Sequence, residues 1–259
     1  MDGLLEDKTA VVTGAASGIG RAIAHRFAEQ GANVVVADVR EDPREDGATT
    51  HERINEETDA RAVFAPCDVS DPAAVEATVD TAVDEFGSID VMVNNAGIVG
   101  PNGPVTDIDP TEYQRLLDIN LNGVFFGSQA AARRMQENDG GSIVNVSSIA
   151  GIRGYSDLAP YCVSKGGIRL LTYSLAAELG GDGIRVNAVH PGVIETAMTT
   201  GDVPIVGTET GEQMRQSIPL GRFGTPEDVA KTALYLASDL ASYVTAESVI
   251  VDGGMVNTA

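Results

Sequence analysis

Short apolar runs alternate with longer amphipathic stretches along almost the whole chain. The first run, KTAVVT at residues 8–13, is apolar and β-branched, as expected of a buried strand. Similar runs occupy residues 33–37, 61–66, 89–93, 142–147, 183–189 and 248–251. Between them, segments such as 71–86 repeat apolar residues at helical spacing. Strands that alternate with helices predict a three-layer, doubly wound α/β fold with a mostly parallel sheet of seven strands.

No internal repeat, low-complexity tract or linker divides residues 1–259, so the sequence predicts one domain. Residues at about 193–219 mix Gly, Thr and Pro with apolar side chains, and we expect this segment to form a lid over a ligand. No apolar run is long enough for a transmembrane helix. The start of the chain lacks the pattern of a signal peptide. The only cysteines, Cys67 and Cys162, indicate no disulfide framework, so we expect a reduced, cytoplasmic protein.

The charge balance is strongly acidic. Lys and Arg total 17 against 38 for Asp and Glu, which gives a formal net charge of −21. Repulsion among these acids opposes folding unless salt screens it, and at about 1 M salt the Debye length falls to roughly 3 Å. The composition resembles that of halophile proteins and predicts function in concentrated salt, with an ordinary acidic protein as the alternative. Binding to nucleic acid or to an anionic membrane is disfavoured.

A glycine-rich turn follows the first predicted strand. Residues 14–20 read GAASGIG and lead directly into a helical pattern. Glycines let the backbone approach a pyrophosphate, and the start of a helix offers unpaired N–H groups. At the end of the next strand, Asp38 can accept hydrogen bonds from ribose hydroxyls. The sequence therefore predicts a dinucleotide site at this turn.

A second group of residues carries candidate chemistry. Tyr161 and Lys165 lie four positions apart in a predicted helix, so that they share one face. An ammonium at close range lowers the pKa of an acid by roughly 1–3 units. We therefore expect Lys165, helped by an oxidised nicotinamide ring, to make Tyr161 an effective acid/base. Ser148 follows an apolar strand, and ligands of open α/β sheets bind at the carboxyl ends of strands.

Together these motifs resemble the short-chain dehydrogenase/reductase family. The resemblance rests on Ser148, Tyr161 and Lys165, on the T-G-x-x-x-G-I-G turn at 13–20 and on the N-N-A-G motif at 94–97. It implies a Rossmann fold in which Tyr161 is the general acid/base, Lys165 lowers its pKa and holds the nicotinamide ribose, and Ser148 binds the substrate oxygen. By the same resemblance, the fourth catalytic residue is Asn120, which stabilises a local kink and holds a water of a proton relay.

The resemblance also implies the cofactor site. Asp68 and Val69 would contact the adenine, with turn capping as the alternative for Asp68, and Ile194 and Thr196 would contact the nicotinamide carboxamide. The full set comprises Thr13, Gly14, Ser17, Gly18, Ile19, Gly20, Asp38, Asp68, Val69, Asn95, Ala96, Gly97, Tyr161, Lys165, Pro191, Gly192, Ile194 and Thr196. His190 is expected to be a packing residue at a strand end, with substrate contact as the alternative. No metal site is expected.

We expect NAD rather than NADP as cofactor. Asp38 repels a 2′-phosphate, and the uncharged Ser17 and Val39 stand where NADP-using relatives tend to carry a base, although Arg40 and Arg44 lie nearby. The expected reaction interconverts a secondary alcohol and a ketone, or a sugar hydroxyl and a lactone. One alternative is an NADPH-dependent 3-oxoacyl-[acyl-carrier-protein] reductase, whose carrier would bind the arginines at 133, 134 and 169. Another is a non-catalytic nucleotide-binding regulator or scaffold.

The substrate is expected to be a small alcohol or carbonyl compound. The absence of an obvious carboxylate clamp in the sequence mildly favours a neutral hydroxyl compound. By the habit of the family we expect a homotetramer in which the long helices at 111–135 and 160–180 pair between subunits.

Overall fold

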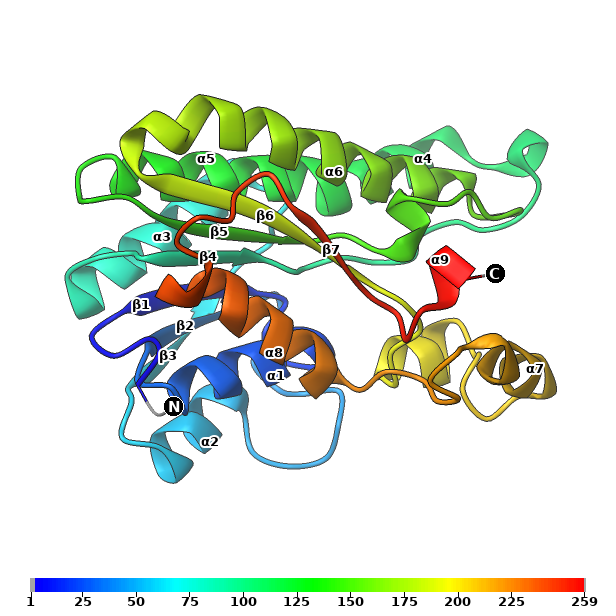
Figure 1. Ribbon diagram of the computed structural model, residues 1–259, viewed down its shortest axis with the longest axis horizontal. Helices are drawn as coiled ribbons and strands as arrows, with labels where there is room; N and C mark the ends of the chain where they lie inside the picture. The colour runs from blue at the N-terminus through cyan, green and yellow to red at the C-terminus, as the bar shows by residue number, and fades with distance from the viewer. Residues whose placement is uncertain (1–2, 259) are drawn as a thin grey trace.

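A computed structural model describes residues 3–258 and shows one twisted sheet between two layers of helices (Figure 1). The seven strands pair in the order β3-β2-β1-β4-β5-β6-β7, and every pair is parallel. The strands are β1 (Thr9–Thr13), β2 (Asn33–Asp38), β3 (Ala62–Pro66), β4 (Val91–Asn94), β5 (Gly141–Val146), β6 (Ile184–Pro191) and β7 (Ser248–Val251). The predicted doubly wound α/β fold is confirmed.

The helices divide between the two faces of the sheet. Helices α1 (Gly18–Ala28), α2 (Thr50–Glu57) and α8 (Pro226–Ala237) cover one face, and α3 (Pro72–Phe86), α4 (Pro110–Leu117), α5 (Gly123–Met135) and α6 (Ala159–Leu179) cover the other (Figure 1). The short helices α7 (Glu209–Ser217) and α9 (Met255–Thr258) lie beyond the carboxyl ends of the strands. No helix within residues 3–258 is long and apolar enough to span a membrane.

The central strands are buried on both faces, which explains their unbroken apolar runs. All five residues of β1 are buried, and side chains of alternate residues enter opposite cores. Val12 packs in the core under α1 and α8, whereas Val11 packs in the core under α3 and α5. Because parallel strands end at the same edge, the loops after β1, β2, β4, β5 and β6 meet at one rim of the sheet.

The predicted long helix at 111–135 is interrupted. A π-helical turn at Asp118–Asn122 separates α4 from α5. The cause is Asn120, which is fully buried and uses its side-chain amide to bond both the N–H and the carbonyl of Ile98, each at 2.8 Å. The π-helical turn lies where the family resemblance places a local kink, and the role that the resemblance gives to Asn120 stays a prediction.

A buried chain of polar side chains crosses the centre of the sheet. Asn94 of β4 donates to Ser128 at 3.0 Å and to Asn145 of β5 at 2.9 Å, and Asn145 donates to Thr172 of α6 at 3.0 Å. All four residues are buried. These hydrogen-bonded side chains connect α5, two strands and α6 at the edge where the site lies. Their hydrogen bonds offset the cost of burying polar groups.

Asn145→Ala should destabilise the protein by about 2 kcal/mol, because it removes two buried hydrogen bonds and leaves polar groups without partners. The free energy of unfolding from urea titration checks this, with the exposed Asn138→Ala as the control. If Asn145→Ala lowers the free energy of unfolding no more than Asn138→Ala does, the stabilising role given to these buried polar side chains is contradicted.

Candidate active site

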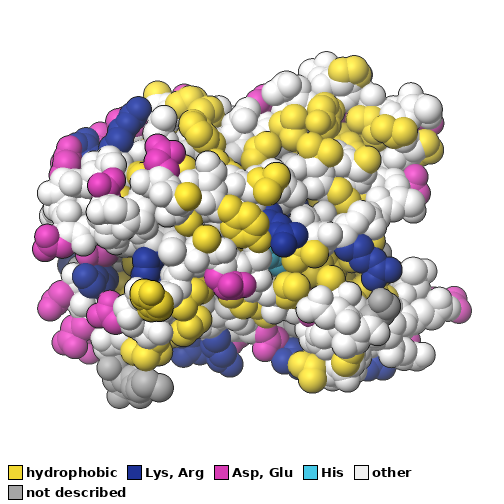
Figure 2. All heavy atoms as spheres, turned by 45° about the horizontal axis from the view of Figure 1, so that its top comes forward, with side chains coloured by type: hydrophobic (Ala, Val, Ile, Leu, Met, Phe, Trp, Pro, Cys, Tyr) yellow, Lys and Arg dark blue, Asp and Glu magenta, His cyan; other side chains and the backbone are white. Residues whose placement is uncertain are grey.

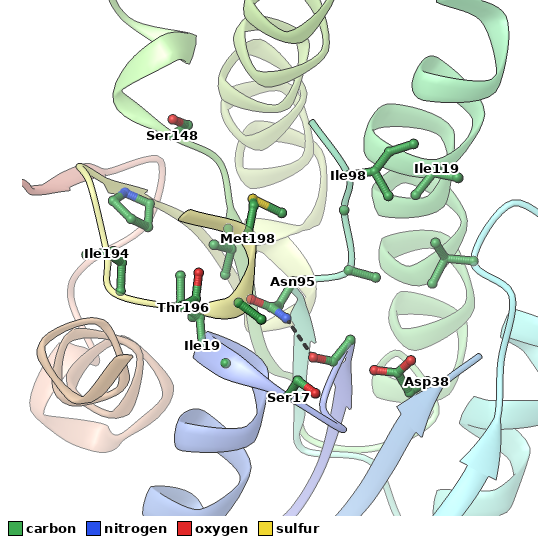
Figure 3. A pocket seen from close by; sticks show the side chains of 18 of the residues that line it. Ser17, Ile19, Asp38, Asn95, Ile98, Ile119, Ser148, Ile194, Thr196 and Met198 are labelled. Carbon is green, nitrogen blue, oxygen red and sulfur yellow. Dashed lines mark hydrogen bonds between the residues drawn. The ribbon is translucent and has the colours of Figure 1, made fainter. Parts of the chain in front are cut away.

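A cavity of about 480 Å³ opens at the carboxyl edge of the sheet, and residues from all the central loops line it (Figure 3). Figure 3 places Asp38 at one end and Ser148 at the other, with Ser17, Ile19 and Asn95 between them. Met198 and Thr196, at the start of the predicted lid, border the same cavity. The cavity is therefore long, with a glycine-rich middle and a polar group at each end.

The turn after β1 brings backbone close to backbone. A Cβ atom on Gly14 would lie 2.9 Å from both the Cα of Ala96 and the Nδ2 of Asn95, and Gly14 has a φ of 64°. Only glycine accepts both constraints easily. Ser17, the N-cap of α1, makes no capping bond with its side chain. The first turn of the helix therefore has N–H groups that can bind an anion, and one of them, the N–H of Gly18, is bonded by the carboxylate of Glu45 at 2.6 Å.

Two residues of the predicted set shape this turn from behind the cavity wall. Thr13 is buried, and its hydroxyl accepts hydrogen bonds from the N–H groups of Asn95 and Ala96 at 3.0 and 3.1 Å. Asn95 in turn donates to the carbonyl of Thr13 at 2.8 Å. Gly20 is buried against the carbonyl of Gly14. Thr13 and Gly20 do not line the cavity; they hold the turn that does.

The structure brings together the three residues of the predicted catalytic group. Ser148 is extended and its Oγ accepts from the N–H of Ala150 at 3.1 Å, while its hydroxyl also pairs with that of Tyr161. Lys165 lies one turn along α6, with its Nζ 5.8 Å from the centroid of the Tyr161 ring. The Lys165 ammonium is buried and donates to the carbonyl of Val146, at the end of β5, at 3.1 Å.

Burial dominates the electrostatics of this group. Burial raises the pKa of Tyr161 to about 12, and the hydrogen bond with Ser148 lowers it only in part. Burial likewise lowers the pKa of Lys165 to about 8. In the protein alone Lys165 does not bring the pKa of Tyr161 down, because the loss of water around the phenol outweighs an ammonium that is bound to a carbonyl, and the joint effect of Lys165 and an oxidised nicotinamide ring stays a prediction.

Asn120 lies behind the cavity and beside Lys165. It is fully buried and does not line the cavity. A Cβ atom on Gly97 would lie 3.2 Å from Asn120 Oδ1 and 3.5 Å from Lys165 Nζ, so both polar atoms flank the same glycine. Asn120 also donates to Ser164 at 3.3 Å. It is thus placed to hold the loop at 97–98 against α6.

The remaining predicted residues fall on the cavity wall. They are Gly14, Ser17, Gly18, Ile19, Asp38, Asp68, Val69, Asn95, Ala96, Gly97, Pro191, Gly192, Ile194 and Thr196. Asp68 also accepts hydrogen bonds from the N–H and hydroxyl of Ser70, at 3.0 and 2.7 Å, so both interpretations of this acid are consistent with the structure. No group of three or more potential metal ligands is found within residues 3–258.

Several lining residues carried no signal in the sequence. Ile98, Ile119 and Arg115 enter the wall from the loop after β4 and from the helices that follow. None belongs to a motif with a chemical requirement at that spacing. Only the packing of distant segments brings them to the cavity.

His190 is a buried residue at the end of β6, as expected, and it supports Ser148 from below. Its Nδ1 bonds the carbonyl of Ser148 at 2.9 Å and its Nε2 bonds the Ser248 hydroxyl at 3.1 Å. Two more hydrogen bonds extend this series. The Ser248 hydroxyl bonds the Tyr173 hydroxyl at 2.8 Å, and Arg169 Nε donates to the Tyr173 hydroxyl at 2.8 Å. The carbonyl of Ser148 can only accept, so Nδ1 carries a proton; with Arg169 donating to Tyr173 and each hydroxyl donating toward His190, Nε2 accepts and the imidazole is neutral. Burial lowers the pKa of His190, in agreement.

The fold and the cavity are those of a dinucleotide-binding α/β protein, with Ser148, Tyr161 and Lys165 at one end of the cavity. The sequence profile of the family described as Enoyl-(Acyl carrier protein) reductase matches residues 14–256. Cis-4-hydroxycyclohexanecarboxylate dehydrogenase of Sinomonas cyclohexanicum is 42% identical over 248 residues, which is 96% of each chain. The 3-oxoacyl-[acyl-carrier-protein] reductase of Chlamydia muridarum is 39% identical over 255 residues, 98% of this chain and all of the other.

A solved structure of a candidate NAD(P)-dependent gluconate 5-dehydrogenase from Beutenbergia cavernae, with bound NADP at low occupancy, superposes with a TM-score of 0.89. It is 33% identical and the match covers 98% of each chain. The chain belongs to the short-chain dehydrogenase/reductase family. It is therefore an oxidoreductase that acts on CH–OH groups, in a family that binds NAD or NADP.

The buried ammonium makes stability depend on pH. The unfolded chain holds the Lys165 proton up to about pH 10.5 and the folded chain only to about pH 8, so deprotonation relieves the cost of burial in between. Lys165→Met lacks this effect. Any stability advantage of Lys165→Met over the wild type should therefore shrink by roughly 2–3 kcal/mol from pH 7 to pH 10. Urea titrations at both pH values measure it; a gap independent of pH would show that Lys165 titrates normally in the folded protein.

Proposed function

We propose that the protein is an NAD-dependent oxidoreductase that interconverts a secondary alcohol and a ketone, or a sugar hydroxyl and a lactone, with Tyr161 as general acid/base. The observation that carries this proposal is the placement of the Ser148, Tyr161 and Lys165 group at one end of a cavity that has Asp38 at the other. A dinucleotide is long enough to join an acid that binds ribose to a distant reacting centre.

The residues of the cavity fit such a cofactor. The close approach of Gly14 to Ala96 and the first turn of α1 suit a pyrophosphate, and Asp38 lies at the end of β2 as expected for an adenosine ribose. A Cβ atom on Gly18 would lie 3.4 Å from Thr196, so the start of the lid lies directly over the turn. We assign Ile194 and Thr196 to the nicotinamide end.

When bound, NAD⁺ supplies the hydride acceptor and a positive charge on its ring. Ser148 donates to the substrate oxygen and orients it. Tyr161 accepts the hydroxyl proton in oxidation and returns it in reduction. Lys165 lies beside Gly97, as Asn120 does, and passes the proton outward. In the reverse direction the same groups act in reverse order.

The raised pKa of Tyr161 refines this mechanism. In the protein alone the phenol is a weak acid, with a pKa of about 12. Buried charges interact strongly because little water screens them. A positive ring close to Tyr161 therefore stabilises the phenolate to a degree that the Lys165 ammonium, bound to Val146, does not. We infer that the base forms only when the oxidised cofactor is present.

The arrangement of the arginines disfavours an acyl-carrier-protein reductase. The arginines of the predicted patch already contact acids of this chain, since Arg133 pairs with Glu76 at 3.2 Å and Arg134 pairs with Asp80 at 2.6 Å. Arg169 donates to Tyr173. An acidic carrier would have to compete with these contacts. Turnover of an acyl-carrier thioester can be compared with turnover of simple alcohols, each with NAD and with NADP, and this comparison separates the two functions. If neither type of substrate is turned over, the non-catalytic alternative is favoured.

The apolar cluster next to Ser148 favours a largely apolar substrate with few polar groups. A third apolar cluster joins Ile149, next to Ser148, with Ile218, Phe223 and Met255, and the lid residues Ile205 and Met214 pack against it. Tyr155 packs there too, and its buried hydroxyl has no partner among the described residues. A neutral cyclic or secondary alcohol matches this environment better than a carboxylate.

We also propose a homotetramer in which α5 and α6 pair between subunits. The outer faces of these helices expose Phe125, Val163 and Leu170, the last at 70% of its full area. Figure 2, in which the top of Figure 1 comes forward, shows hydrophobic side chains gathered on the upper part of the molecule, while acidic and basic side chains are interspersed mainly at the left. An apolar patch on a chain with a net charge of −21 is best explained by a second subunit.

Tyr161→Phe should reduce turnover about 100- to 10,000-fold, because it removes the group that transfers the proton. The affinity for NAD⁺ should change little, since the ring keeps its packing. Steady-state rates with a panel of alcohols, together with titration calorimetry of NAD⁺, test both halves. Undiminished turnover would contradict the assignment of Tyr161.

Salt should stabilise the protein, because screening removes repulsion among the excess acids. We expect the temperature of thermal unfolding to rise from dilute buffer to about 2 M KCl, beyond the rise in a neutral osmolyte of equal osmolality. Equal stability in dilute buffer and KCl would contradict adaptation to salt.

A further inference from the structure

His190 is a buried titratable residue next to Ser148, and the mechanism proposed above gives it no part. It has no exposed surface and does not line the cavity, so it can act only through other residues. We propose that His190 is a positioning residue, which aims the Ser148 hydroxyl at the substrate by holding the backbone carbonyl of Ser148. The inference rests on the proposed function, because it assumes that Ser148 binds the substrate oxygen.

Ser148 lies just beyond the point where the sheet holds the chain. The N–H of Ser147 still donates to the carbonyl of Val189 at 2.8 Å, and a 3-10 turn at Ile149–Gly151 follows Ser148. Within residues 3–258, the bond of 2.9 Å between His190 Nδ1 and the Ser148 carbonyl is the one hydrogen bond that joins residues 148–151 to β6. His190 therefore fixes this turn against the strand.

The direction of the Ser148 hydroxyl depends on the orientation of its backbone. The Oγ accepts from the N–H of Ala150 at 3.1 Å and its hydroxyl pairs with that of Tyr161. Because the carbonyl carbon and the Cβ atom are attached to the same Cα atom, a rotation of the carbonyl away from His190 also moves Oγ away from Tyr161. A displacement of about 1 Å at a reacting centre can cost roughly 100-fold in rate.

The hydrogen-bonded series behind His190 keeps its imidazole in the form that this task requires. The series starts at Arg169, whose Nε can only donate, and passes through the hydroxyls of Tyr173 and Ser248 to Nε2 of His190. A cationic imidazole that donates from both nitrogens is disfavoured by burial, which lowers the pKa of His190. A positive charge at the start of the series polarises each bond in the same direction, which makes Nδ1–H a stronger donor to the Ser148 carbonyl.

Two amide variants separate the position of the donor from the packing of the side chain. The amide nitrogen of asparagine is as many bonds from the Cβ atom as Nδ1 of histidine, so His190→Asn keeps a donor for the Ser148 carbonyl. The amide of glutamine lies one bond further, at the reach of Nε2, so His190→Gln keeps a partner for Ser248 but loses that donor. Each variant buries one amide in place of the imidazole, which makes the two a matched pair.

The experiment measures kcat and KM with NAD⁺ and the fastest alcohol from a panel of cyclic and secondary alcohols. His190→Gln should lower kcat about 10- to 100-fold, because Ser148 is no longer aimed, whereas His190→Asn should stay within about threefold of the wild type. The KM for NAD⁺ should change by less than about twofold in both variants, because neither touches the cofactor turn. Urea titrations of both variants control for a loss of stability.

A spectroscopic measurement tests the form of the imidazole without any turnover. The chain has three histidines, and in protein labelled with ¹⁵N at histidine the signals of His190 are assigned by their loss in His190→Asn. At pH 7, Nδ1 should carry a proton and Nε2 none.

An equal loss of kcat in the two variants, an undiminished kcat in His190→Gln, or a proton on Nε2 would overturn the role given to His190. If the wild type oxidises no alcohol, the proposed function fails and this inference fails with it. Turnover by the wild type together with an unchanged rate in His190→Gln overturns this inference alone, so the two failures are distinguishable.

Discussion

The buried pair of a phenol and an ammonium is the constraint on which the site depends. Removing water from both groups drives their pKa values in opposite directions, to about 12 for Tyr161 and about 8 for Lys165. The ammonium therefore loses its proton more readily than the phenol. Such a pair is a poor base until another positive charge arrives, which makes acid/base chemistry conditional on the oxidised cofactor. This condition would protect the site from unproductive proton transfer.

The fold provides the rigid frame that this pair needs. Lys165 is held by the carbonyl at the end of β5, Ser148 follows the same strand, and His190 of β6 fixes the Ser148 carbonyl. The buried Asn94–Asn145 contact ties β4 to β5 just before the strands release their loops. Side chains fixed in this way by strands and a long helix keep their mutual distances better than side chains on loops alone.

Much of the fold was predictable from the sequence because burial on both faces leaves apolar runs that stand out, as in β1 and β2. The motif residues of the site were also predictable, because each depends on local backbone geometry. Gly14 has a positive φ, and Tyr161 and Lys165 share one helix face at i, i+4 spacing. The upward shift of the Tyr161 pKa in the protein alone was not predictable, because sequence spacing shows that two residues are close but not how much water each one loses on folding. The Arg44–Asp202 pair and the Glu45–Gly18 contact were also missed, because only tertiary packing joins segments so far apart.

The most direct test of the central claim is the titration of the Tyr161 phenol itself. Carbon NMR of tyrosine labelled at the ring carbon that bears oxygen, with the signal assigned by its loss in a phenylalanine variant, follows this one group through pH. The account predicts a pKa of about 12 in the protein alone and a fall of roughly 2 units or more when NAD⁺ is bound. A pKa that does not move on adding NAD⁺, or one already near neutrality without it, would contradict the account.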